Sequence, residues 1–243
     1  MKIKFSPAYI PAFLSLLFLT QECHDWAHVI WARIICGCWG TKAFDSWSIC
    51  NNCQASAQLQ VLIWLAGPAA TYIIISLAWW LMQKRNSAEQ KSFGFALLFS
   101  AVPFVRILAA LAGGTDETYA LRQLFQHADG SNRHIVALSG LLLILFFTIP
   151  ALLRALILLQ EWKKRVFLFP LFLLLPMYIE RWVFRAMNSF DSKKILPGSI
   201  LPGTSWLVVL WTIFLLIILG ITYNSLLNFL KPSGNNRKGF KVQ

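Results

Sequence analysis

Two histidines and an aspartate stand in the middle of a long apolar run near the start of the chain. His24 and His28 are four residues apart, and Asp25 directly follows the first of them. On a helix this spacing puts both imidazoles on one face, where two ring nitrogens can bind one zinc ion. In zinc enzymes with an H-E-x-x-H pattern, the glutamate at the position of Asp25 deprotonates the metal-bound water. The pattern H-D-W-A-H therefore predicts a zinc site with Asp25 as its catalytic base.

A structural role for the same residues is the alternative, with the two histidines pairing with Glu22 or Asp25 in a polar network. The preceding stretch YIPAFLSLLFL covers about half a bilayer, which puts the polar cluster near mid-depth. An ionised side chain there costs about 2.5–3.5 kcal/mol, and such residues usually face a bundle interior and serve a function. We therefore favour metal binding over the structural network.

The rest of the chain has the composition of a polytopic membrane protein. It is 57% hydrophobic and 13% charged, about half the charge of a soluble domain, and its apolar residues come in long blocks. Because lipid offers no partner to open backbone groups, every span must be helical. We predict an all-α membrane helix bundle of about six transmembrane helices, with prolines 103, 150, 170 and 176 kinking or interrupting spans. The predicted spans are Ala8–Cys36, Gln58–Gln83, Phe93–Gly113, Ile135–Leu159, Val166–Met187 and Pro202–Leu230.

The net charge of +12 fits a membrane surface better than nucleic acid, because the basic residues lie mostly at the ends of apolar blocks. With six spans, 13 Lys and Arg residues fall on the side of both termini and seven on the other. The positive-inside rule therefore predicts that both termini are cytoplasmic. We expect residues 1–230 to form a single integral membrane domain and 231–243 a disordered basic tail.

Two motifs carry a family resemblance. The stretch HDWAHVIWARIICG resembles the first motif of the site-2 protease family of intramembrane zinc metalloproteases, with Asp25 in place of the family's Glu. The other positions that match it are His24, His28, Ala32, Arg33 and Gly37. The stretch LAGPAATYIIISLAWW resembles the family's Ala-Gly-Pro-x-x-Asn segment, with Thr71 where Asn is usual. The resemblance covers residues 8 to about 120, which would form a metalloprotease-like core, with additional helices over 135–230.

A catalytic zinc site needs a third protein ligand and an open position for water. In the family this ligand is an aspartate on a later span, and the corresponding stretch here is ALAGGTDETYA. We predict Asp116 as the third ligand, with Glu117 as its substitute. An ordinary helix start, with Thr115 as N-cap and acidic residues in the first turn, is the alternative. Both can hold if the Asp116 side chain turns inward.

Four cysteines form the pattern C-x-C-x11-C-x2-C in one short connection: Cys36, Cys38, Cys50 and Cys53. In an extracytoplasmic loop they would form one or two disulfides, and in a cytoplasmic loop they could bind zinc through four thiolates. The charge count favours the first, whereas the family's usual arrangement puts the catalytic site toward the cytoplasm, so both stay open. We expect Cys23 to be buried and unpaired.

Arg106 lies inside the third predicted span, where we expect it to form an ion pair with Glu22 or Asp25. Together, these features predict a zinc-dependent intramembrane endopeptidase that cleaves a transmembrane or membrane-proximal peptide bond in a membrane protein or peptide within the lipid bilayer. One alternative is a catalytically inactive relative that binds membrane partners. The other, a small metal or proton transporter, ranks lower because the last three spans contain no second polar band. Substrate and oligomeric state are not encoded in these motifs.

Overall fold

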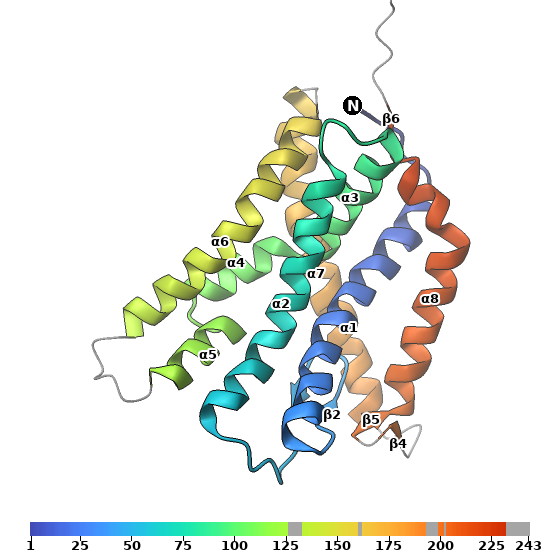
Figure 1. Cartoon of the computed structure of the whole chain (residues 1–243). Helices are drawn as coiled ribbons and strands as arrows, with labels where there is room; N and C mark the ends of the chain where they lie inside the picture. The colour runs from blue at the N-terminus through green and yellow to red at the C-terminus, as the bar shows by residue number, and fades with distance from the viewer. Residues whose placement is uncertain (126–132, 160–161, 193–198, 202, 232–243) are drawn as a thin grey trace, which may run out of the picture.

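The computed structural model of the chain describes residues 1–125, 133–159, 162–192, 199–201 and 203–231. These residues form an all-α membrane helix bundle (Figure 1). Its helices are α1 Tyr9–Cys36, α2 Ala57–Leu81, α3 Ala88–Ser100, α4 Pro103–Leu111, α5 Asp116–Leu124, α6 Arg133–Leu158, α7 Trp162–Ser192 and α8 Trp206–Leu227.

Within the described residues, five helical segments are long and apolar enough to cross a membrane. They are Ala57–Leu81, Ala88–Leu111, His134–Leu158, Arg165–Phe190 and Trp206–Leu227. The 28-residue α1 is not among them, because its second half is polar. It nevertheless packs against α2, α8 and α3 and runs through the bundle (Figure 1). The all-α fold is thus confirmed.

The third predicted span is divided into two helices. Between them, Val102 has φ 46° and ψ 52°, a left-handed conformation that is rare for a β-branched residue. Pro103 has no backbone N–H and therefore takes the first position of a new helix instead of continuing α3. The predicted interruption at Pro103 is present, whereas the other three prolines lie inside continuous α6 and α7. The break lets α4 leave the line of α3 and pack against α6 (Figure 1).

Short strands, which we did not predict, join distant parts of the chain. At one end of the bundle β1 (Lys2–Ile3) pairs antiparallel with β6 (Leu230–Lys231) (Figure 1). Lys231 is therefore part of a strand and not of a disordered tail, while residues 232–243 lie outside the described part. At the other end is a four-stranded sheet. Its order is β3 (Trp47–Ser48), β2 (Thr41–Lys42), β5 (Thr204–Ser205) and β4 (Ser199–Leu201).

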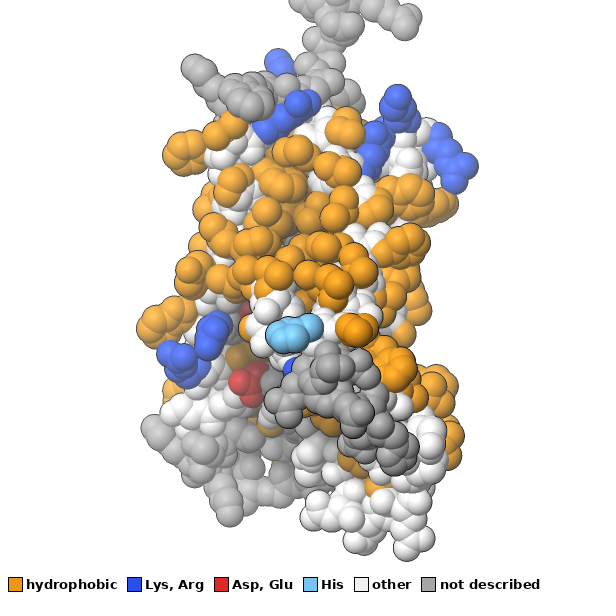
Figure 2. Space-filling view, turned by 90° about the vertical axis from the view of Figure 1, so that its left-hand side faces the viewer, with side chains coloured by type: hydrophobic (Ala, Val, Ile, Leu, Met, Phe, Trp, Pro, Cys, Tyr) orange, Lys and Arg blue, Asp and Glu red, His pale blue; other side chains and the backbone are white. Residues whose placement is uncertain are grey.

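The largest apolar core lies toward the end that carries β1 and β6, and it is rich in aromatic rings. Tyr9 stacks on Phe229 with 4.0 Å between ring centroids, and Phe95 packs against Phe99 and Phe172. On the outside, many large apolar side chains of α6, α7 and α8 are exposed. Figure 2, which faces the side of the bundle that carries α6, shows a broad apolar band with lysine and arginine side chains above it. Lipid would cover such a band.

Candidate metal centre

Three possible metal ligands converge where α1, α2 and α5 meet. Nε2 of His24 lies 3.2 Å from Nε2 of His28 and 3.2 Å from Oδ2 of Asp116. Nε2 of His28 lies 3.5 Å from the same carboxylate oxygen. One ligand atom from each residue lies within 4.8 Å of the others, which suits a common ion with bonds of about 2 Å. The residues predicted from two motifs far apart in the sequence are thus brought together.

The His28 ring is held in the orientation that a ligand needs. Its Nδ1 lies 2.6 Å from the carbonyl oxygen of Ile63, which can only accept a hydrogen bond. Nδ1 therefore carries the proton, and the lone pair of Nε2 points at His24 and Asp116. Metal-binding histidines commonly donate their second ring N–H to a carbonyl in this way.

Thr71 offers the same support to His24. Its hydroxyl donates to the carbonyl oxygen of Gly67 at 3.2 Å, and its oxygen lies 3.0 Å from Nδ1 of His24. Nη2 of Arg106, which can only donate, lies 2.6 Å from the same Nδ1 and 3.2 Å from the Thr71 oxygen, so the guanidinium occupies this position in the structure. Once the guanidinium turns away, Nδ1 can donate to Thr71 and leave Nε2 of His24 free to bind a cation. A hydroxyl oxygen such as that of Thr71 can accept a hydrogen bond from a ring N–H as an amide oxygen would.

Gly67 allows α2 to approach the two rings closely. A Cβ atom built on it would lie 2.1 Å from Nε2 of His28 and 2.6 Å from Cε1 of His24. Any side chain at this position would clash with both rings. Small residues let two helices approach closely, and the missing side chain of Gly67 thus leaves room for an ion.

Asp116 is the first residue of α5, directly after the N-cap Thr115, whose hydroxyl accepts from the backbone N–H of Thr118 at 3.3 Å. The two interpretations of this segment therefore both hold: it begins a helix, and its first acid turns inward. Burial raises the pKa of Asp116, but the neighbouring His24 and His28 rings outweigh burial and hold the pKa below its ordinary value. The Asp116 side chain is 24% exposed, whereas His28 is fully buried, so the site opens on the Asp116 side.

Glu117 does not substitute for Asp116. Its buried carboxylate accepts from the Tyr72 hydroxyl, and Oε1 lies 3.3 Å from Nη1 of Arg106. The Arg106 ion pair is therefore present, but the expected partners Glu22 and Asp25 were wrong. The other guanidinium nitrogen, Nη2, lies 2.6 Å from Nδ1 of His24. The kink at Val102 explains the difference, because it turns α4 and its arginine toward α5.

Asp25 is placed beside a lysine that sequence reasoning did not single out. Oδ2 of Asp25 lies 2.9 Å from Nζ of Lys42, and Oε2 of Glu22 lies 3.4 Å from the same nitrogen. Lys42 and Glu22 are both buried. Asp25 is not among the three residues that converge as possible metal ligands. Nothing in the sequence distinguishes Lys42 from the basic residues that lie at helix ends.

The charges around the three ligands suit a cation. The carboxylates of Asp116 and Glu117, set against one guanidinium from Arg106, leave one net negative charge beside the two imidazoles. Two histidine nitrogens and one carboxylate oxygen are a ligand set that catalytic zinc sites use, with the fourth position left for water. The ligand atoms, the tautomer of His28 and the space left beside Gly67 thus fit a zinc ion.

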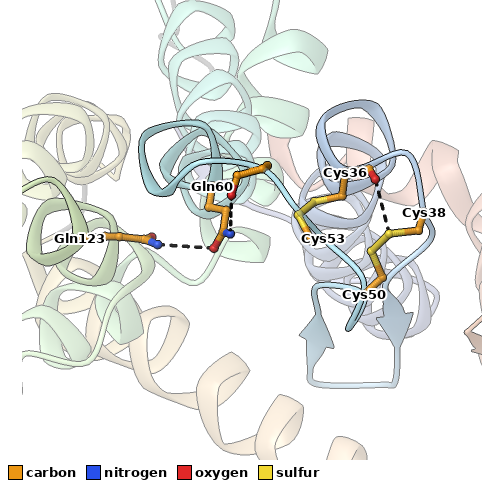
Figure 3. The surroundings of a disulfide bond; sticks show 7 residues. Cys36, Cys38, Cys50, Cys53, Gln60 and Gln123 are labelled. Carbon is orange, nitrogen blue, oxygen red and sulfur yellow. Dashed lines mark hydrogen bonds between the residues drawn. A yellow bond between two sulfur atoms is a disulfide. The ribbon is translucent and has the colours of Figure 1, made fainter.

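The four clustered cysteines form two disulfides, Cys36–Cys53 and Cys38–Cys50 (Figure 3). This resolves the choice that the sequence left open, since paired sulfurs are not thiolate ligands for zinc. Cys23 is free, as expected, but its side chain is exposed and not buried.

Comparison with protein-family models, with curated proteins and with solved structures gives no match for this chain.

Proposed function

We propose that the protein is a zinc-dependent intramembrane endopeptidase whose metal is held by His24, His28 and Asp116. The observation that carries the proposal is the convergence of these three side chains, from α1 and α5, on one point. A site of this kind among helices of membrane-spanning length would act on a peptide bond in or near a transmembrane segment.

When bound, zinc would polarise the scissile carbonyl and lower the pKa of a bound water. The chain's own residues have separate tasks. Ile63 and Thr71 orient the two imidazoles, and the buried surroundings of His28 keep bulk water from the rear of the site. The partly exposed Asp116 marks the side from which a locally unwound substrate would approach. Asp25, next to His24 in sequence, is the proposed proton acceptor.

A second candidate function is a non-catalytic, metal-binding relative that binds membrane proteins. One observation favours it: the Asp25 carboxylate pairs with Lys42 at 2.9 Å. A base held in this way would have to turn from the lysine before it could take a proton from water. Aspartate is also one methylene shorter than the glutamate usual in such motifs.

The test is cleavage of a labelled transmembrane peptide by the purified protein in liposomes, with zinc supplied or removed by a chelator. For the peptidase we expect zinc-dependent cleavage by the wild type and a loss of about 100-fold or more in Asp25→Asn. Glu89→Gln, an exposed carboxylate at the start of α3, is the matched control and should leave the rate unchanged. Cleavage that appears only in Asp25→Glu would establish the non-catalytic alternative.

A further inference from the structure

The connection between α1 and α2 is tied down at both ends. Cys36, the last residue of α1, is bonded to Cys53 shortly before α2, and Cys38–Cys50 closes the inner part (Figure 3). We call residues 36–53 the disulfide loop. The side chain of Gln60 donates to the carbonyl oxygen of Ala55 at 3.0 Å, which fixes the exit of the loop on α2. The loop therefore has little freedom to move away from the helices it joins.

Trp47 of the disulfide loop covers the ring of His28. The two rings are nearly parallel, at 12°, with centroids 4.0 Å apart. Trp47 in turn contacts Trp64 of α2 at 4.8 Å, and Trp64 stacks on Tyr119 of α5 at 5.5 Å. This row of aromatic rings connects the loop with the two helices that complete the site, and it fixes the plane of the His28 imidazole.

Lys42 of the same loop reaches the other side of the motif. Its Nζ lies 2.9 Å from Asp25 and 3.4 Å from Glu22, and its side chain is fully buried. Lys42 and Trp47 are opposite each other in the antiparallel pair of β2 and β3. Residues directly opposite in such a pair point to the same face. One face of a two-stranded hairpin therefore presents both residues to α1, one to His28 and the other to Asp25.

We propose that the disulfide loop positions the metal site, with Trp47 as the positioning residue for His28. The inference rests on the proposed function in so far as His28 binds zinc. The carbonyl of Ile63 fixes the protonated edge of the His28 ring, and Trp47 fixes its plane, so together they aim Nε2. Loss of such an outer partner typically weakens metal binding 10- to 100-fold.

The first experiment measures zinc affinity by competition with a chelating dye. We expect Trp47→Ala to bind zinc about tenfold more weakly than the wild type, and Trp47→Phe, which keeps a ring face, to restore most of the affinity. The matched control is Trp39→Ala, because Trp39 lies in the same loop but its ring contacts Arg33, with the guanidinium carbon 5.8 Å from the ring centroid. Equal zinc affinity in Trp47→Ala and the wild type would overturn the proposal.

The second experiment uses metal-free protein, so it decides the role of the loop even if the wild type binds no zinc. Diethyl pyrocarbonate modifies accessible imidazoles, and the rate at His28 is followed by mass spectrometry well below the unfolding temperature. We expect His28 to react several-fold faster in Trp47→Ala than in the wild type or in Trp39→Ala. The same rate in all three proteins would show that Trp47 does not hold the ring. A wild type that binds no zinc would overturn the proposed function by itself.

Discussion

The two halves of α1 are stabilised in different ways. From Tyr9 to Leu19 the helix contributes apolar side chains to a core rich in aromatic rings. From Thr20 to Cys36 it contributes Glu22, His24, Asp25 and His28, each beside a particular polar partner. Within lipid, close packing stabilises the first half, whereas the second depends on each charge finding its counter-charge. The packed first half of α1 thus supports the polar second half, in which single residues can be substituted to test one interaction each.

The largest effect is expected from Lys42→Met, which leaves the buried Glu22 and the partly buried Asp25 without their common counter-charge. Breaking a buried ion pair in this way typically costs about 3–5 kcal/mol. We expect a loss of this size in the free energy of unfolding, measured by denaturant titration in detergent micelles. The control is Lys84→Met, at an exposed position after α2, which should change stability little. Equal stability of the two variants would contradict the ion-pair account.

Phe95→Ala tests the apolar core against which the first half of α1 packs. Phe95 is fully buried and contacts Phe99, Phe172 and Phe229. The cavity should cost about 3 kcal/mol of unfolding free energy. Because the core of aromatic rings is separate from the ligands, zinc affinity should stay within about twofold of the wild type, measured by competition with a chelating dye. A large loss of affinity would show that the two halves of α1 are not independent.

The helices and the three candidate ligands could be predicted from the sequence, because long apolar segments and patterns within one helical turn are visible there. Helices of 20 or more apolar residues are recognised from composition, and α1 begins and ends within one residue of its predicted bounds. The two histidines four residues apart, and the Thr-Asp helix start of α5, are patterns within one turn of helix. These local patterns predict the three ligands His24, His28 and Asp116, and the structure brings the three side chains together.

Other features could not be predicted because they depend on the tertiary fold. Strands of two residues have no periodicity to detect, so the hairpin that brings Lys42 and Trp47 to α1 left no signal. The partner of Arg106 depends on the direction that α4 takes after Val102, which the presence of Pro103 alone does not specify. The choice between disulfides and a zinc knuckle needed the relative positions of all four cysteines.

Gly67→Ala, on α2, tests the polar half of α1 without changing a charge, because Gly67 faces His24 and His28. The added Cβ would lie 2.1 Å from Nε2 of His28, so the ring must turn away from the common point. We expect zinc affinity to fall about 100-fold, as for loss of strong support to a ligand. Gly220→Ala is the matched control, because a Cβ there meets nothing within 4 Å, and it should bind zinc like the wild type. Similar zinc affinities in the two variants would contradict the inference that Gly67 leaves room for the ion beside His24 and His28.

Arg106→Gln should have a smaller effect, and in the opposite direction. The substitution removes a positive charge 2.6 Å from His24 and frees the negative charge of Glu117. Both changes favour a cation, and we expect zinc affinity to rise about tenfold at low salt. The same chelator competition measures it, with Arg122→Gln, at the far end of α5, as control. Unchanged or weaker binding in Arg106→Gln would contradict the charge balance assigned to the site.

The most direct test is the number of zinc ions bound per chain, determined by mass spectrometry of metals in protein purified under native conditions. The account predicts one ion per chain in the wild type. It predicts almost none in His28→Ala and Asp116→Ala, each compared with the control Glu89→Gln. A wild type without zinc after incubation with the ion, or an Asp116→Ala variant that retains a full complement, would contradict the assignment of His24, His28 and Asp116 as a metal centre.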